Sequence, residues 1–251
     1  MTLPPALRPV VAITQARISS SRLPAKVLIE IAGHPLLWWH LSRLKQAHLI
    51  DRIVVATTQE PEAAAIVAIA EELGIAAYRG SLDDVLARFS GAAQMARAAT
   101  VIRVTSDCPL IDPALIDLAI ESYAATWPGS SYVSIDSTRY PRGLDCEVFA
   151  RTALDAASAE AVSPFDHEHV TPFIRANPAR FNPRALVPHA LAPDEVPAPQ
   201  RWCVDTVEDL ALVRQVLEHF GDAPFGWRDI LSLIDSHPEW YRLNAHVAQK
   251  A

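Results

Sequence analysis

The sequence predicts an α/β protein with a mostly parallel sheet and helices on both of its faces. Short runs rich in Val, Ile and Thr occupy residues 10–14, 52–58 and 100–105, and a weaker run lies at 75–79. Longer segments, in which apolar residues recur at helical spacing, separate these runs. Regular alternation of buried strands and helices is the pattern of a doubly wound parallel sheet.

Four helices are predicted between and after these strands, at residues 35–47, 61–73, 81–97 and 114–125. Pro35 suits a first helical position, where its missing N–H would have no partner, and Gly74 suits a helix end. Ser81 is predicted to cap the third helix, with Asp83 and Asp84 in its first turn, where the helix dipole favours acids.

The regular alternation stops after a turn at Pro128 and Gly129. We expect strands at 132–135 and at the end of 138–149, a polar segment at 163–175, a proline-rich arm or irregular β segment at 178–199, and a short strand at 202–204. Thr206 is predicted to cap a helix at 207–220, and a last helix is predicted at 228–235. No stretch has the composition of a linker, so we expect one domain over residues 1–251, with a small β excursion at about 130–200.

Composition limits the classes of function. The formal net charge of −7, without any block of Lys or Arg, argues against broad binding to nucleic acid. No apolar run approaches the roughly 18 residues of a membrane span, and no basic leader precedes a cleavage site, so a cytoplasmic protein without membrane contact is expected. Cys108, Cys146 and Cys203 are odd in number and widely spaced, which disfavours a disulfide framework or a zinc site.

A polar loop follows the first predicted strand. It carries Arg17, Arg22 and Lys26 among Ser19, Ser20 and Ser21, at the sheet edge where open α/β sheets bind ligands. Arg offers a bidentate fork for phosphate oxygens and Lys a movable point charge, so the loop suits a triphosphate. We expect Lys26 to be exposed and to face the phosphates. A solvated surface turn would carry the same residues.

Two acids follow later strand-like runs. Asp107 comes directly after the run at 100–105, and Asp205 follows residues 202–204. If both runs end at one sheet edge, the two carboxylates meet there, at the edge where such sheets bind ligands. The alternative is that both acids are helix caps. Asp145 and the neighbouring Arg142 lie in a further polar stretch that could face a polar substrate, or solvent, or a second subunit.

Several common catalytic motifs are absent from the sequence. No glycine precedes a lysine, so there is no Walker A loop, and no G-x-G-x-x-G follows the first strand. No G-x-S-x-G supplies a serine-hydrolase nucleophile. His167 and His169 are two residues apart, whereas the zincin arrangement needs histidines four apart on a helix.

Five ordered motifs resemble one family, the cytidylyltransferases that activate acidic sugars, namely the acylneuraminate and Kdo cytidylyltransferases. The motifs are TQARISSSRLPAKV, TSDCPLID, GLDCEVF, EHVTP and WCVDTVEDL, and together they span nearly the whole chain. They are most similar to the spore-coat polysaccharide branch of the family. That branch is defined by reaction type more than by one sugar, so the sugar or other acceptor is left open.

The resemblance implies a nucleotide-diphosphosugar-transferase fold, which is Rossmann-like and GT-A-like, and the reaction of CTP with an acidic sugar, or a related acid or phosphonate, to give a CMP-sugar and pyrophosphate. It implies Mg²⁺ as cofactor and a homodimer formed through the excursion. The implied catalytic residues are Arg17, Lys26, Asp107 and Asp205, with Asp107 and Asp205 as metal ligands. The implied nucleotide-binding residues are Gln15, Ala16, Arg17, Ser20, Arg22, Lys26, Thr105 and Asp107, and the candidate substrate-binding residues are Arg142, Asp145, Glu147 and His169.

Two other classes of function remain open. A glycosyltransferase of GT-A fold that uses a nucleotide sugar could share the sheet, although its metal acids typically form a D-x-D pair, and Asp107 is followed by Cys and Pro. A non-catalytic nucleotide-binding relative would keep the fold but lose a cation or a metal acid. Release of pyrophosphate from CTP in the presence of an acceptor distinguishes the three.

Overall fold

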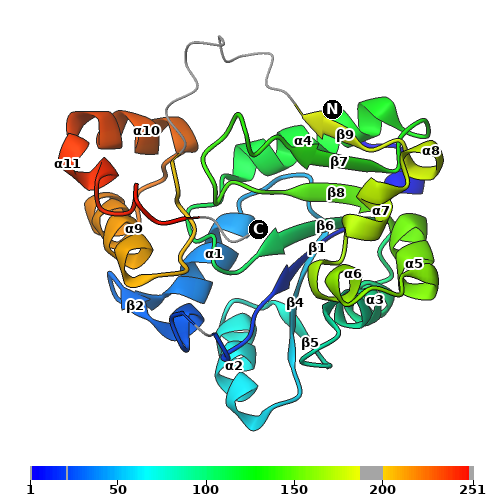
Figure 1. The fold of residues 1–251 in the computed structure, drawn as a ribbon, viewed down its shortest axis with the longest axis horizontal. Coiled ribbons are helices and arrows are strands. Elements are labelled where there is room, and N and C mark those ends of the chain that lie inside the picture. The colour runs from blue at the N-terminus through cyan, green and yellow to red at the C-terminus, as the bar shows by residue number, and fades with distance from the viewer. Residues whose placement is uncertain (1, 21, 187–199, 249–251) are drawn as a thin grey trace.

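The computed structural model describes residues 2–20, 22–186 and 200–248. Within them, a seven-stranded sheet in the order β5–β4–β1–β6–β8–β7–β9 crosses the molecule (Figure 1). Its strands are β1 (Val10–Gln15), β4 (Arg52–Thr58), β5 (Ala76–Gly80), β6 (Thr100–Thr105), β7 (Tyr132–Ile135), β8 (Glu147–Ala150) and β9 (Arg184–Leu186). A separate two-stranded ribbon, β2 (Glu30–Ile31) with β3 (His34–Pro35), follows the polar loop.

The strands of the first half of the chain are parallel, as predicted. β1 pairs in parallel with both β4 and β6, and β4 pairs in parallel with β5. β8 is antiparallel to β6 and to β7, whereas β9 runs parallel to β7. The sheet is therefore mostly parallel, and the strands of the expected excursion extend this sheet instead of forming a separate β unit.

Helices cover both faces of the sheet, because the strands present apolar residues on both sides. In β1, Val10 and Ala12 join one buried cluster while Val11 and Ile13 join the other. The first cluster lies under α1 (Leu36–Leu44), α2 (Ala64–Glu72), α4 (Pro113–Thr126), α9 (Val207–Phe220) and α10 (Trp227–Ser236), and the second under α3 (Val85–Met95), α5 (Arg151–Glu160), α7 (Pro172–Ala176) and α8 (Pro178–Phe181). Burial on both faces is typical of parallel sheets.

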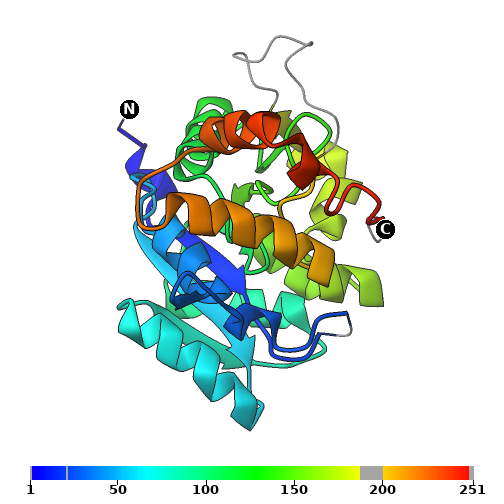
Figure 2. The same cartoon turned by 90° about the vertical axis from the view of Figure 1, so that its left-hand side faces the viewer.

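The remaining helices are short. They are η1 (Pro5–Leu7), η2 (Lys26–Leu28), η3 (Pro61–Ala63), α6 (Pro164–His169) and α11 (Pro238–Tyr241). Figure 2 shows α9 and α10 in front of the sheet, on the face that also carries α1. No helix among the described residues is long and apolar enough to cross a membrane.

Several local predictions differ from the structure. The N-cap of α3 is Asp84, whose carboxylate accepts from the Ala87 N–H, because the helix begins at Val85; Ser81 lies in the preceding turn, where its hydroxyl accepts from the Asp84 N–H. Residues 202–204 form no strand, since their backbone bonds are isolated: the Trp202 N–H donates to the Arg142 carbonyl and the Val204 N–H to the Asp107 carbonyl, beside an isolated bridge between Arg142 and Arg201. Helix α5 was not predicted. The expected arm begins with α8 and β9, and its residues 187–199 lie outside the described part of the chain.

Candidate active site

The loop after β1 folds back over the end of the sheet. Its reversal is closed by a hydrogen bond from the Ala25 N–H to the Ile18 carbonyl, 3.0 Å long, and Ala25 takes a left-handed backbone conformation with φ of 53°. The turn η2 starts at the next residue, Lys26. This geometry directs Lys26 inward, and Arg22 also reaches the acidic residues behind the loop.

Lys26 is the centre of a buried cluster of charges. Its ammonium group donates to Asp107 Oδ2 at 3.0 Å, to Asp205 Oδ1 at 2.8 Å and to the Val204 carbonyl at 2.7 Å. These three bonds use all the donors of the ammonium group. The Lys26 side chain is only 13% exposed, so the expectation of an exposed lysine was wrong, whereas its role toward the phosphates stays a prediction.

The fold brings Asp107 and Asp205 together although 98 positions separate them. Asp107 lies just beyond the carboxyl end of β6, and its carbonyl accepts from the Val204 N–H at 2.7 Å. This bond joins the segment after β6 to the segment before α9, next to Asp205. Neither carboxylate caps a helix, because Asp112 caps α4 and Thr206 caps α9. The cap of α9 by Thr206 confirms that prediction.

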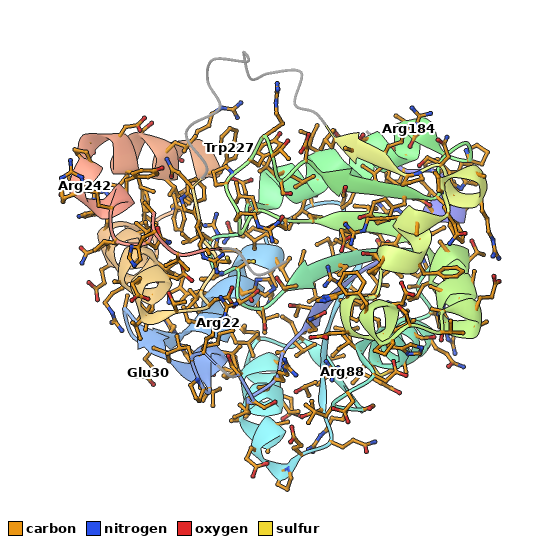
Figure 3. All side chains as sticks on the ribbon, viewed as in Figure 1. Arg22, Glu30, Arg88, Arg184, Trp227 and Arg242 are labelled. Carbon is orange, nitrogen blue, oxygen red and sulfur yellow. The ribbon has the colours of Figure 1, made fainter. Side chains whose placement is uncertain are left out.

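Asp205 is held by further cations and by a buried acid that sequence analysis missed. Its Oδ2 accepts from Arg201 at 2.5 Å and forms an ion pair with Arg22, labelled in Figure 3, at 2.9 Å. Arg201 also binds Asp209 through Nε at 2.8 Å, and Asp209 accepts the backbone N–H groups of Asp205 and Thr206. The motif VDTVEDL thus contains both the half-buried Asp205 and the buried Asp209 that orients it.

The three groups at the centre perturb one another's ionisation. Burial alone would raise the pKa of Asp107, but the charge of Lys26 and hydrogen bonds from Thr105, Lys26 and Cys108 lower it to about 2. Burial would also raise the pKa of Asp205, but the hydrogen bond and the charge of Lys26 lower it. Burial would lower the pKa of Lys26, yet the charges of Asp107 and Asp205 raise it. All three groups are therefore charged at neutral pH.

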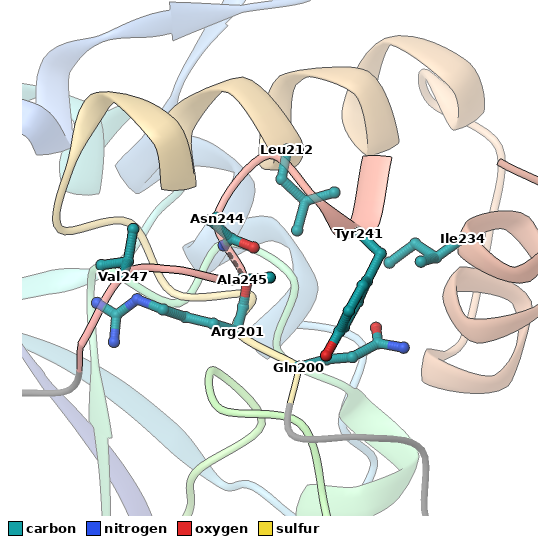
Figure 4. A pocket seen from close by; sticks show the side chains of 8 residues that line it. All are labelled: Gln200, Arg201, Leu212, Ile234, Tyr241, Asn244, Ala245 and Val247. Carbon is teal, nitrogen blue, oxygen red and sulfur yellow. Dashed lines mark hydrogen bonds between the residues drawn. The ribbon is translucent and has the colours of Figure 1, made fainter. Parts of the chain in front are cut away.

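Further support comes from the C-terminal segment behind the cluster. Figure 4 shows a small pocket where Asn244 lies against Arg201, lined also by Gln200, Leu212, Ile234, Tyr241, Ala245 and Val247. The Asn244 amide donates to the Arg201 carbonyl at 2.7 Å and to Asp209 at 3.0 Å. The residues around this pocket pack against Arg201, which holds Asp205, and the pocket lies behind the charged cluster.

The loop at 139–145 lies beside the segment that carries Asp205. Arg142 donates its N–H to the Gln200 carbonyl at 2.9 Å, and its carbonyl accepts from Trp202 at 2.6 Å. Gly143 has a φ of +106°, and a Cβ there would lie 2.7 Å from the Trp202 backbone, so glycine is required for this close approach. The Arg142 guanidinium donates to Asp145 at 3.1 Å, and both side chains are partly exposed on this loop.

Glu147 and His169 lie in other surroundings. Glu147 accepts from Tyr132 at 2.5 Å and Thr171 at 2.6 Å through Oε1, and from Arg103 at 2.5 Å through Oε2. Its partners come from β6, from β7 and from the start of α7, so both oxygens are used inside the fold. His169 is half-buried on α6, where its ring meets the edge of Phe165 at 4.5 Å between centroids.

The remaining nucleotide-binding candidates surround the carboxyl ends of β1 and β6. Gln15 ends β1, and its Oε1 is buried without a hydrogen-bond partner among the described residues. Ala16 is buried beside it, and Thr105 ends β6 next to Asp107. Arg17 is exposed, and within the described ranges neither it nor Ser20 has a side-chain hydrogen bond or ion pair. Ser21 lies outside the described residues.

Cys108→Ser is expected to leave activity within roughly tenfold of the unchanged protein. The Cys108 thiol is buried, and burial raises its pKa well above the usual value, so no nucleophilic thiolate forms at neutral pH. The measurement is turnover of the folded variant, with Cys146→Ser as a buried control. Complete loss of activity in folded Cys108→Ser protein would contradict this packing role.

The two carboxylates fit a divalent cation. Their oxygens converge on the Lys26 ammonium, which shows that a positive charge is accommodated between them. Mg²⁺ usually binds one or two protein carboxylates together with waters and substrate phosphates. No group of three His, Cys, Asp or Glu side chains suited to a metal occurs in residues 2–20, 22–186 and 200–248.

The fold and the site define a class of protein. A mostly parallel sheet places an Arg- and Lys-bearing loop and two converging carboxylates at the carboxyl ends of β1 and β6, the edge where such sheets bind nucleotides. The class is that of the nucleotidyltransferases with a Rossmann-like sheet. The family model described as cytidylyltransferase matches residues 11–222. The chain therefore belongs to the cytidylyltransferase family.

Individual relatives agree with this assignment. An uncharacterised protein of Methanocaldococcus jannaschii is 34% identical over 96% of this chain and 97% of its own length. The spore coat polysaccharide biosynthesis protein SpsF of Bacillus subtilis is 31% identical over 90% of this chain and 94% of its own. A cytidylyltransferase structure from Leptospira borgpetersenii superposes with a TM-score of 0.86 at 26% identity, covering 96% of this chain and 98% of that one. These findings confirm the family and the fold predicted from the motifs.

Proposed function

We propose that this enzyme transfers a cytidylyl group from CTP to an acidic sugar, or to a related acid or phosphonate, giving a CMP-linked product and pyrophosphate with Mg²⁺ as cofactor. The observation that carries the proposal is the convergence of Asp107 and Asp205 on Lys26, below a loop that also supplies Arg17 and Arg22. Such a set of fixed acids and movable cations suits the charge changes of phosphoryl chemistry.

In this reaction an oxygen of the acceptor forms a bond to the α-phosphorus while the bond to the β-phosphate oxygen breaks. Positioning and neutralisation of charge supply most of the catalysis in such in-line transfers. Asp107 and Asp205 would hold Mg²⁺, which when bound neutralises phosphate oxygens. Arg17 and Arg22 would bind the triphosphate and the leaving pyrophosphate, and Lys26 would turn from the carboxylates to the phosphates.

The acceptor is proposed to bind beside the 139–145 loop. Arg142 and Asp145 form a partly exposed pair on this loop, which backbone hydrogen bonds tie to residues 200–202, close to Asp205 in the chain. A guanidinium and a carboxylate together suit an acceptor with both an anionic group and hydroxyls. Glu147 is fully occupied inside the fold, and we propose that it shapes the acceptor site from behind.

The biological setting follows from the same proposal. SpsF is named for polysaccharide biosynthesis, and we propose that the product of this enzyme likewise serves the synthesis of a surface polysaccharide or glycan. A homodimer formed through the region at about 130–200, and a cytoplasmic location, stay predictions.

The test is pyrophosphate release from CTP across a panel of sugar acids and phosphonates, each with and without Mg²⁺. A cytidylyltransferase releases pyrophosphate only with a suitable acceptor, and a CMP-linked product appears in equal amount. Binding of CTP without release for any acceptor would favour a nucleotide sensor. Activity that requires a nucleotide sugar, with release of the free nucleotide, would favour a glycosyltransferase.

We expect CTP to bind at least tenfold more tightly than ATP, which corresponds to about 1.4 kcal/mol. The buried and unpartnered Gln15 Oε1 can accept a hydrogen bond from the exocyclic amino group of cytosine. Adenine carries the same kind of donor, so the preference over ATP follows from the cytidylyltransferase family to which the chain belongs. Calorimetry with non-hydrolysable analogues of both nucleotides measures the difference. Equal affinities would contradict the expected preference.

A further inference from the structure

Helix α1 presents two buried polar side chains to the segment that follows β6. His40 is fully buried, and Arg43 is 3% exposed one turn later. The Arg43 Nε donates to the Ile111 carbonyl at 2.7 Å, and a ring nitrogen of His40 lies 2.9 Å from the Cys108 carbonyl. Residues three apart on a helix share a face, so the side chains of His40 and Arg43 both bond to the same stretch of chain, 108–111.

The hydrogen bonds of His40 fix its tautomer. The Cys108 carbonyl can only accept, so Nδ1 must carry a proton and donate to it. Burial lowers the pKa of His40 to about 4, so the ring is neutral at pH 7. Its Nε2 then accepts from the Thr14 hydroxyl, 2.9 Å away on β1. The ring is thus held between the strand that leads into the phosphate loop and the segment that contains Asp107.

The Cys108 carbonyl lies at the end of the turn that contains Asp107. The Cys108 N–H bonds the Thr105 carbonyl at 3.2 Å, which closes a tight turn with Asp107 inside it. The Asp107 carbonyl accepts from the Val204 N–H, and the Asp107 carboxylate faces Lys26. A turn fixed at its last carbonyl keeps the Asp107 carboxylate aimed at its partners. Without that bond, the turn would lose its tie to α1.

We propose that His40 is a positioning residue, whose Nδ1–H holds the Cys108 carbonyl and so orients the Asp107 carboxylate toward Lys26 and Asp205. The part of this inference that concerns Mg²⁺ rests on the proposed function. The part that concerns the turn stands on the hydrogen bonds alone and is tested without any substrate.

Two conservative variants separate the two bonds of the ring. In His40→Asn the amide nitrogen can occupy the place of Nδ1 and keep the bond to the Cys108 carbonyl, while the contact with Thr14 is lost. In His40→Gln the longer side chain reaches Thr14 at the place of Nε2, while the Cys108 carbonyl loses its donor. Ser42→Ala is the matched control, because this hydroxyl on the same helix is buried and has no hydrogen-bond partner among the described residues.

The first measurement is amide hydrogen exchange in peptides covering residues 104–110, in free protein without metal. We expect His40→Gln to speed exchange there at least about tenfold, whereas His40→Asn and Ser42→Ala stay within about threefold of the unchanged protein. Equal protection in the Asn and Gln variants would overturn the proposal. So would faster exchange in His40→Gln that is equally large in the peptide 151–160 of α5, on the other face of the sheet, since that reports a general loss of stability.

The second measurement is the Mg²⁺ concentration at half-maximal turnover. We expect it to rise at least about tenfold in His40→Gln and to stay within threefold in His40→Asn. An unchanged midpoint in folded His40→Gln would overturn the positioning role. If the unchanged protein shows no Mg²⁺-dependent turnover, the proposed function fails, and the exchange experiment still decides the inference.

A third measurement needs no variant and covers the case in which His40→Gln does not fold. The nitrogen chemical shifts of the His40 ring in the unchanged protein at pH 7 should show a protonated Nδ1 and an unprotonated Nε2. A protonated Nε2 with an unprotonated Nδ1 would remove the donor to Cys108 and overturn the proposal.

Discussion

Asp107→Asn and Asp205→Asn are each expected to lower cytidylyl transfer by at least about a hundredfold, and the double variant should be hardly worse than the worse single variant. Effects of residues that act as one unit are strongly non-additive. Both carboxylates contact the same Lys26 ammonium, at 3.0 and 2.8 Å, which makes them one unit in the structure. Independent sites would instead multiply their losses.

The measurement is turnover against Mg²⁺ concentration for both single variants and the pair, with thermal melts of each protein. Asp117→Asn is a matched control, because this half-buried acid accepts from the backbone N–H groups of His48 and Leu49 and does not contact Lys26. Each site variant should need more Mg²⁺ than the control. A Mg²⁺ curve like that of the unchanged protein, in either folded single variant, would remove that residue from the metal site.

Much of this site could be predicted from the sequence, because its residues follow recognisable strands. The runs at 10–14 and 100–105 appear as the parallel neighbours β1 and β6, so a loop after one and an acid after the other must meet at one edge. Asp205 was harder to place from periodicity, because residues 202–204 form no strand. Its position depends on tertiary hydrogen bonds, among them those of Val204 with Asp107 and of Trp202 with Arg142.

The supporting residues could not be predicted, because tertiary contacts alone give them their roles. Arg201 and Asp209 look like ordinary members of a polar segment and a helix, yet Asp209 is fully buried and holds Arg201. His40 falls within an apolar helical pattern, and nothing local indicates that Thr14 and Cys108 lie on either side of it. The spacing of apolar residues shows which face of a helix or strand is buried, but it does not show which residues pack against that face.

In the polar segments, too, the sequence did not show which side chain makes a given local contact. Ser81 and Asp84 both have side chains that can cap a helix, and Asp84 is the cap because α3 begins at Val85, after a turn in which the Ser81 hydroxyl accepts from the Asp84 N–H. Lys26 was expected to be exposed because it lies in a polar loop. The left-handed residue Ala25 turns the chain before it, and the lysine points inward.

Lys26→Met should therefore change both activity and stability. We expect turnover to fall at least about a hundredfold, because the variant lacks the charge that can turn to the phosphates. We also expect unfolding to require about 3 kcal/mol less free energy in the absence of Mg²⁺. Methionine keeps much of the length of the side chain but leaves Asp107 and Asp205 facing each other without the shared cation. Urea unfolding at pH 7 measures the loss, with Lys45→Met as the exposed lysine control.

The same geometry predicts that Lys26→Met gains more stability from Mg²⁺ than the unchanged protein does. In the unchanged protein a divalent ion must displace the ammonium, which occupies an oxygen of each carboxylate, whereas in the variant both carboxylates are open to it. A ligand that binds only the folded state stabilises it by RT ln(1 + [L]/Kd), so the protein with the lower Kd gains more stability at the same concentration. Melting temperatures at increasing Mg²⁺, without nucleotide, should thus rise at lower concentrations in Lys26→Met. If Mg²⁺ raises both melting temperatures equally, the lysine and the metal do not share one site.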